Sequence, residues 1–228
     1  MACKLCARWR ARLWEKSDAW ERAHSNESAL WSDEPVQNRE LVEQAYAVQN
    51  TEPAAAFRLY LEAAEAGSAW AMDAIAWHYE TGTAVAADLD WAQEYYRRAI
   101  SAGSWMATIH YARLLADDGH HDECESVLAD GVSSDFVPAY FWLAWFRYQR
   151  CKSRKVCLEI KPMLEHAASA GHPGALVMLG QLMIRGKFGL REIPAGFNWG
   201  LRWLSRSAVD AEDGVGDRSA AVDVRGRA

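Results

Sequence analysis

Apolar and small residues recur along this chain at the spacing of one helix face, in segments of about a dozen residues that end at glycine. The clearest two segments cover residues 69–81 and 89–102. Their apolar positions are Ala71, Met72, Ile75, Ala76 and Tyr79, then Leu89, Ala92, Tyr95, Tyr96 and Ala99. Asp88 suits an N-cap, while Gly82 and Gly103 suit left-handed helix ends. The pattern predicts a helical hairpin.

The hairpin pattern repeats at a period of about 36 residues. Before it lie expected helices at about 37–49 and 53–64, and later copies begin near Ala107, Ala139 and Ala175. Expected second helices cover about 121–130, ending at Gly131, a segment around Pro162 and about 195–209. Pro162 either kinks its helix or marks a late start. Short hairpins bury their apolar faces only by stacking, so we expect an all-α fold, an α/α superhelical solenoid of stacked helical hairpins.

Three regions follow from this pattern. Residues 1–36 are expected to be an N-terminal helix and a linker, 37–209 the repeats and 210–228 a disordered tail. The linker prediction rests on the polar stretch 25–37, which contains Pro35. The first dozen residues are basic and aromatic, so the N-terminal helix either caps the open end of the stack or touches an anionic membrane.

The repeats resemble the Sel-1-like repeat family, a relative of the tetratricopeptide repeats. The matching positions are Ala71, Ile75, Ala76, Tyr79, Gly82, Val85, Asp88, Ala92, Tyr95, Tyr96, Ala99 and Gly103, with a further copy at Ala175, Leu179, Gly180, Gly186, Trp203 and Leu204. The resemblance covers roughly residues 50–209. It implies a superhelix that assembles protein complexes, without catalytic residues. Its members occur in bacterial signalling and secretion and in eukaryotic protein quality control, and we expect a bacterial scaffold or adaptor.

Composition narrows the function further. The net charge of −6 argues against a general nucleic-acid binder. No apolar run approaches the roughly 20 residues of a transmembrane helix, and the N-terminus has no signal-like apolar stretch. Five irregularly spaced cysteines do not form a disulfide framework. We therefore expect a cytoplasmic protein in a reducing compartment.

The candidate chemical motifs are weak. Cys3 and Cys6 have a metal-like spacing but no second pair. Cys151 and Cys157 lie in a Lys/Arg-rich segment and match no metal motif, and the adjacent His120 and His121 point to different sides of a helix. We expect no enzyme activity, no cofactor and no metal. Some proteins that resemble this family are described as hydrolases of β-lactam-like substrates, but those have regular cysteine pairs that this chain lacks.

A partner site is expected on the first helices of the hairpins, opposite their core positions, because first helices line the concave face of such solenoids. The expected partner-binding residues are Asp73, Trp77, Glu80, Arg113, Phe141, Trp145, Tyr148 and Gln181. Aromatic residues in a groove are typical anchors. The interpretation is a non-catalytic scaffold that holds a protein or peptide segment. Three alternatives stay open: Phe141, Trp145 and Tyr148 form the core of a rotated repeat, they mediate self-association, or the protein is a membrane-associated regulator tethered by its N-terminus.

Overall fold

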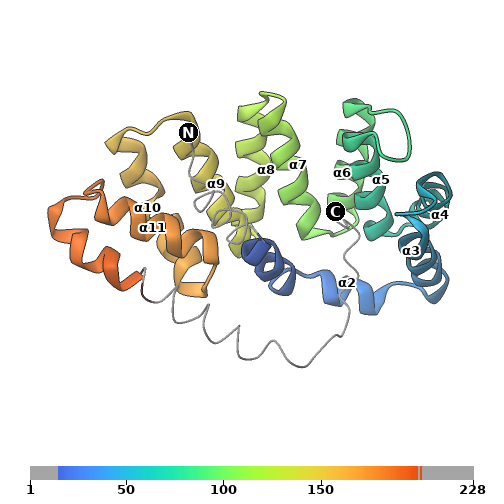
Figure 1. Cartoon of the computed structure of the whole chain (residues 1–228), viewed down its shortest axis with the longest axis horizontal. Coiled ribbons are helices and arrows are strands. Elements are labelled where there is room, and N and C mark those ends of the chain that lie inside the picture. Colours follow the sequence, from blue (N-terminus) through green and yellow to red (C-terminus); the bar gives the residue numbers. More distant parts are fainter. Residues whose placement is uncertain (1–14, 200, 202–228) are drawn as a thin grey trace. The chain divides into compact units, whose positions relative to one another are not determined.

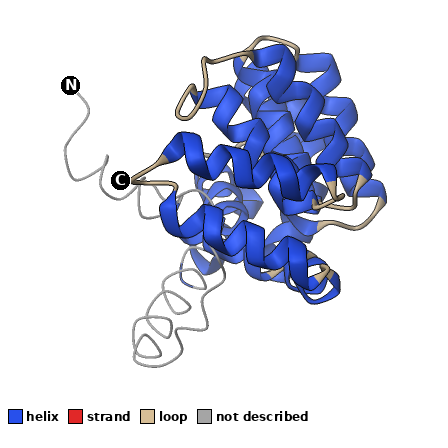
Figure 2. Ribbon diagram, turned by 90° about the vertical axis from the view of Figure 1, so that its right-hand side faces the viewer, coloured by secondary structure: helices blue, strands red, loops and turns tan. Residues whose placement is uncertain are grey.

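The computed structural model describes residues 15–199 and 201, and this part of the chain is helical and contains no strand (Figure 2). The described residues form two compact units. Residues 25–127 make up the first unit, and residues 15–24 together with 128–199 and 201 make up the second unit. The division falls inside helix α8 (His121–Ser133). The tail predicted at 210–228 and the basic residues 1–14 lie outside the described residues.

Helices of the first unit follow the predicted hairpins closely (Figure 1). They are α2 (Glu27–Asp33), α3 (Val36–Val48), α4 (Pro53–Glu65), α5 (Ala69–Thr81), α6 (Leu89–Ser101) and α7 (Trp105–Asp117). From α3 onward, each helix packs against its neighbours in the chain. The helix α2 lies within the stretch expected to be a linker, and its Trp31 packs edge-on against Trp70 of α5, with ring centroids 5.4 Å apart. The sequence therefore identified the repeats but missed a short helix.

The second unit contains a helix over residues 15–23, α9 (Val137–Arg150), α10 (Arg154–Ala170), α11 (Pro173–Ile184), the 3-10 turn η1 (Leu190–Glu192) and helical residues 193–199. The helix α10 packs against both α9 and α11. Because α10 begins at Arg154, Pro162 lies inside the helix and does not mark a late start. The expected second helix at 195–209 lies partly outside the described residues.

Small side chains line the helix contacts, and aromatic side chains fill the space beside them. Ala56, Ala71, Ala76, Ala92, Ala99, Ala107 and Ala112 are fully buried, as are Tyr60 and Tyr96. Alanine lets two helix backbones approach closely, and each large ring removes substantial apolar area from water. The stacked hairpins therefore have a continuous core within each unit.

The turn between hairpins is built the same way each time. Gly67, Gly103, Asp135 and Gly171 have φ values of 98°, 96°, 54° and 101°, in the left-handed region. In each case the next residue donates its N–H to a carbonyl five residues back, and the left-handed residue donates to one three residues back. This is the Schellman motif, which glycine favours. The prediction that α8 stops at Gly131 is wrong, because the helix continues to Ser133 and Asp135 makes the turn.

His78 is an exception in the apolar core of the first unit. The side chain is 1% exposed, and neither ring nitrogen has a hydrogen-bond partner among the described residues. Rings of Phe57, Tyr60 and Trp77 surround it at centroid distances of 5.8, 5.9 and 5.0 Å. Burial lowers the pKa of His78 from 6.5 to about 4. The matching positions of α7 and α11 hold buried leucines, Leu114 and Leu182.

Replacing His78 with Leu is expected to raise the melting temperature. The substitution removes two unsatisfied polar atoms from the core, and burying each such atom costs about 1–3 kcal/mol. The pKa of His78 is lower in the folded chain, so protons bind preferentially to the unfolded chain as the pH falls from 6.5 toward 4. The wild type loses stability over that range, and His78→Leu lacks this loss. We therefore expect the melting temperature of His78→Leu to exceed that of the wild type by more at about pH 5 than at about pH 7.5. An equal gain for the exposed control His121→Gln would contradict this origin.

Candidate functional site

The predicted site residues of the first unit lie half-buried on α5 and α7. Asp73 Oδ1 is 2.8 Å from Nδ1 of His110, which links α5 to α7. Glu80 Oε2 accepts a hydrogen bond of 2.6 Å from the hydroxyl of Tyr96 on α6. Both carboxyl groups therefore contact neighbouring helices within the unit. Trp77 and Arg113 occupy the same position of successive first helices, and each keeps part of its side chain at the surface.

A second polar contact follows one hairpin further on. The Tyr111 hydroxyl donates to Glu123 Oε1 at 2.7 Å and accepts from Arg97 Nε at 3.0 Å. Burial and the hydrogen bond to Glu123 raise the pKa of Tyr111. The Tyr111 hydroxyl joins α6, α7 and α8 through these two hydrogen bonds, so it has a structural role.

In the second unit, the predicted aromatic stripe on α9 divides into a buried and a surface part. Phe141 is 1% exposed, and its ring stacks on His172 with centroids 4.4 Å apart. The prediction that Phe141 presents its ring at the surface is therefore wrong, because the turn before α11 covers it. Trp145 and Tyr148 are half-buried, and Gln181 on α11 is exposed. The surface part of the stripe thus begins at Trp145.

A buried polar cluster holds residues 15–24 on the second unit. Glu21 is 2% exposed and accepts hydrogen bonds from Trp142 Nε1, at 3.2 Å to each carboxyl oxygen. Its Oε1 also lies 2.9 Å from Nε2 of His172, which is fully buried. Because Nδ1 of His172 accepts from the Ala175 N–H at 3.2 Å, the ring proton sits on Nε2 and donates to Glu21. The cluster is fully hydrogen-bonded.

His172 occupies the N-cap position that serine fills elsewhere. Ser68 and Ser104 accept from the N–H groups of Ala71 and Ala107, three residues on, as His172 accepts from Ala175. Histidine adds a second nitrogen, and this nitrogen binds Glu21. Sequence reasoning missed this cluster. The signal was available, since the repeat period aligns His172 with two serines, but nothing local indicates that Glu21 lies beside it.

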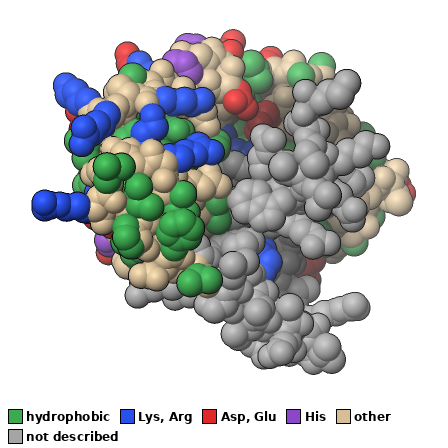
Figure 3. Space-filling model, turned by 60° about the vertical axis from the view of Figure 1, so that its left-hand side comes forward, with side chains coloured by type: hydrophobic (Ala, Val, Ile, Leu, Met, Phe, Trp, Pro, Cys, Tyr) green, Lys and Arg blue, Asp and Glu red, His purple; other side chains and the backbone are tan. Residues whose placement is uncertain are grey.

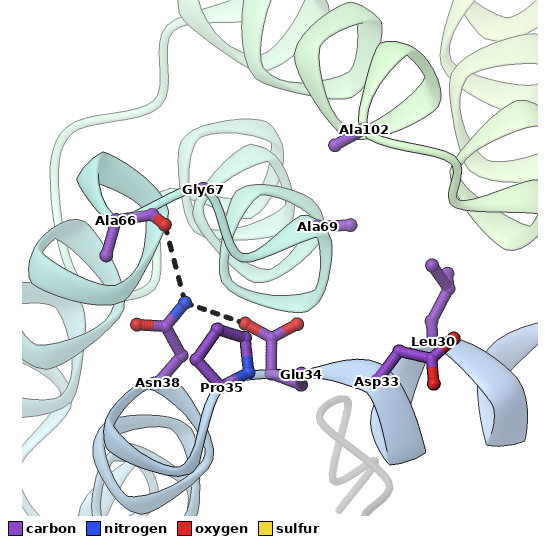
Figure 4. A pocket seen from close by; sticks show the side chains of 9 residues that line it. All are labelled: Leu30, Asp33, Glu34, Pro35, Asn38, Ala66, Gly67, Ala69 and Ala102. Atoms are coloured by element: carbon purple, nitrogen blue, oxygen red, sulfur yellow. Dashed lines mark hydrogen bonds between the residues drawn. The ribbon is translucent and has the colours of Figure 1, made fainter.

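Two asparagine side chains, one before α2 and one on α3, contact the turns of the first unit. Asn26 Nδ2 donates to the Gly103 carbonyl at 2.6 Å, and the Trp105 N–H donates to Asn26 Oδ1 at 3.1 Å. Asn38 Nδ2 donates to Glu34 at 2.9 Å and, at 3.5 Å, to the Ala66 carbonyl (Figure 4). Beside Asn38 is a shallow cavity of about 250 Å³ with two carboxyl groups, those of Asp33 and Glu34, on its wall. It carries no nucleophile or cation among its lining residues.

Groups that could support metal or thiol chemistry are sparse in the described part of the chain. No three His, Cys, Asp or Glu side chains gather there as a metal site would require. Cys124 and Cys157 are buried, and Cys151 is exposed with a pKa lowered by its hydrogen bond with Ser153. Cys3 and Cys6 lie outside the described residues. Across residues 15–199 and 201, every helix is too short or too polar to cross a bilayer.

These features define an all-α repeat protein built from stacked helical hairpins. A Sel1 repeat protein from Oxalobacter formigenes superimposes with a TM-score of 0.62 at 17% identity, over 82% of this chain and 84% of that chain. The protein c5321, a protective antigen present in uropathogenic Escherichia coli strains and displaying an SLR fold, superimposes with a TM-score of 0.59 at 12% identity. That match covers 75% of this chain and 38% of c5321.

This chain therefore has the Sel1-like repeat (SLR) fold, and the resemblance seen in its repeats is confirmed at the level of the fold. No protein-family model matches the sequence, and no curated protein is similar to it.

Gly174→Ala is expected to destabilise the protein, although alanine normally improves a helix by about 0.5–1 kcal/mol. A Cβ at Gly174 would lie 2.6 Å from Cζ of Phe141, whose ring is 1% exposed and stacks on His172. In a double-mutant cycle with Phe141→Leu, the combined variant should lose less stability than the sum of the two single variants. Denaturant unfolding measures all four proteins. Additive losses would show that the ring does not restrict position 174.

Glu21→Ala is expected to cost about 2–4 kcal/mol, because it removes the acceptor of the buried Trp142 and His172 N–H groups. His172→Ser, which keeps the helix cap seen at Ser68 and Ser104, should cost less than Glu21→Ala. The exposed Glu15→Ala on the same helix serves as the control. Thermal unfolding of the full chain compares the three variants, and equal losses for Glu21→Ala and Glu15→Ala would disprove the role of the cluster.

Proposed function

We propose that this protein is a non-catalytic scaffold that binds a segment of another protein through the first helices of its hairpins, considered separately in each unit. The observation that carries the proposal is the placement of Trp77, Trp145 and Tyr148. The core-facing sides of α5 and α9 are buried, whereas these three rings keep part of their area at the surface. The SLR fold of the chain supports the same reading, since stacked hairpins present extended binding surfaces.

Half-exposed aromatic side chains suit this role for a physical reason. A tryptophan or tyrosine buries a large area on binding while few rotatable bonds are fixed. Arg113 and Gln181 on neighbouring first helices supply polar contacts beside the rings. The carboxyl groups of Asp73 and Glu80 contact His110 and Tyr96, so we assign them mainly a structural role, which is to position α5 against α7 and α6. Phe141 supports Trp145 from the core, with ring centroids 6.2 Å apart.

The partner in this proposal is a protein or peptide segment, and neither nucleic acid nor a cofactor has a part in it. The cytoplasmic location and bacterial source expected from the sequence stay predictions. The membrane-tethered alternative depends on residues 1–14, and the hydrolase alternative has no catalytic group to support it among the residues described above.

Affinity capture from the native host, followed by mass spectrometry and titration of the purified partner, tests the proposal. Trp77→Ala and Trp145→Ala should each weaken binding by at least about 30-fold, the effect of removing an interface hot spot. Trp91→Ala is the matched control, because Trp91 is 49% exposed but lies on the second helix α6. Circular dichroism confirms that each variant is folded. If Trp91→Ala weakened binding as much as Trp77→Ala and Trp145→Ala, a binding site on the first helices would be contradicted.

A further inference from the structure

Positive charge is concentrated in two segments of the second unit. Residues 147–155 contain five Lys or Arg and no acidic residue, and residues 185–191 contain three and no acidic residue, in a chain of net charge −6. The cations are Arg147, Arg150, Lys152, Arg154, Lys155, Arg185, Lys187 and Arg191. We refer to these eight residues as the basic edge. Six of them are exposed, and Arg147 and Lys187 are half-buried.

Chain topology brings the two segments to the same end of the unit. The helix α10 starts beside the end of α9 and runs to the turn that begins α11, so the start of α10 and the end of α11 lie together. Side chains confirm the placement: Lys161 of α10 lies 5.5 Å from the ring centroid of Phe188, and its Nζ lies 3.1 Å from Glu192. Lys187 also acts on Cys157 of α10, where it opposes the rise in pKa caused by burial.

Exposed apolar side chains accompany the cations. Leu158 is 48% exposed one turn after Arg154, Ile184 is 41% exposed beside Arg185, and Leu190 is 81% exposed beside Arg191. Figure 3 shows Lys and Arg side chains gathered next to a group of hydrophobic side chains on this face. Tyr148 adjoins the same edge, with Lys152 Nζ 5.9 Å from its ring centroid. The surface is therefore mixed, with positive charge and apolar area side by side.

Two of these cations occupy positions that helix electrostatics disfavour. Arg154 and Lys155 lie in the first turn of α10, which carries no acidic residue, and Lys152 directly precedes its N-cap Ser153. The N-terminus of a helix is already positive, so each cation there costs roughly 0.3–1 kcal/mol. Among the described residues, Lys155 pairs with Glu159 at 3.9 Å, and an exposed pair at this distance offsets little of the cost. Local rules of stability are broken most often where a residue serves a function.

We propose that the basic edge binds an acidic amphipathic segment of a partner protein. This inference rests on the proposed scaffold function and names the chemistry of the partner in the second unit. Carboxylates of the segment face the exposed cations Lys152, Arg154, Lys155, Arg185 and Arg191. Its apolar side chains cover Leu158, Ile184 and Leu190. A peptide fits better than nucleic acid, since the apolar side chains match no phosphate backbone and the remainder of this acidic chain repels a long polyanion.

Fluorescence anisotropy of the full chain with a labelled peptide tests the proposal. The fluorescein-labelled peptide has about 15 residues, with Leu on one face of a helix and Glu on the opposite face. Lys152→Glu/Lys155→Glu should weaken binding at least about tenfold at about 0.15 M salt. Its melting temperature should equal or exceed that of the wild type, because acidic residues suit the start of α10. Arg39→Glu/Arg58→Glu makes the same change in net charge in the first unit and should leave binding nearly unchanged.

Three results would overturn the inference. They are equal binding by the wild type and Lys152→Glu/Lys155→Glu, equal binding of a peptide with Gln in place of Glu, and tighter binding of single-stranded DNA or phosphatidylserine vesicles than of the peptide. The scaffold proposal is tested separately through Trp77 and Trp145. A captured partner that depends on those two residues while the acidic peptide fails to bind would reject the basic edge and leave the scaffold intact.

Discussion

The turn between one hairpin and the next is the constraint on which this structure depends. A left-handed residue ends each second helix, and the following side chain caps the next first helix at Ser68, Ser104 and His172. This arrangement satisfies backbone groups at both helix ends in very few residues. It also fixes the direction in which each first helix leaves the turn. Without it, the alanine faces could not meet closely enough to form a core.

The same turns also form hydrogen bonds with side chains near the start of the described residues. Glu21 bonds to His172, Asn26 bonds to Gly103 and Trp105, and Asn38 reaches the carbonyl of Ala66. Polar side chains at the N-terminal ends of the first helices are consequently used for structure. The groups that the scaffold proposal assigns to partner binding lie toward the opposite ends, as Trp145 and Tyr148 do on α9. The turn therefore accounts for the structural half of each first helix and leaves the other half to the proposed binding role.

Periodicity in the sequence was enough to predict the hairpins, because small residues and glycines repeat at fixed spacing and neighbouring copies impose the same packing. It failed where contacts are particular to one place. Phe141 was expected at the surface, but Gly174 lets the turn before α11 approach and cover its ring. Residues 27–33 lack a repeat pattern, yet they form a helix whose Trp31 packs against Trp70. Glu21 and His172 are too far apart in sequence for any local signal to pair them.

Two features of the second unit carry an electrostatic cost, and only one of these costs is offset by neighbouring residues of the fold. Glu21 is buried, but Trp142 and His172 together supply hydrogen bonds that offset the loss of water. Arg154 and Lys155 stand at the start of α10 and receive no comparable compensation from the described residues around them. The buried Glu21 is therefore explained by its structural role. Cations whose cost is not offset within the fold are better explained by a partner that supplies the missing negative charge.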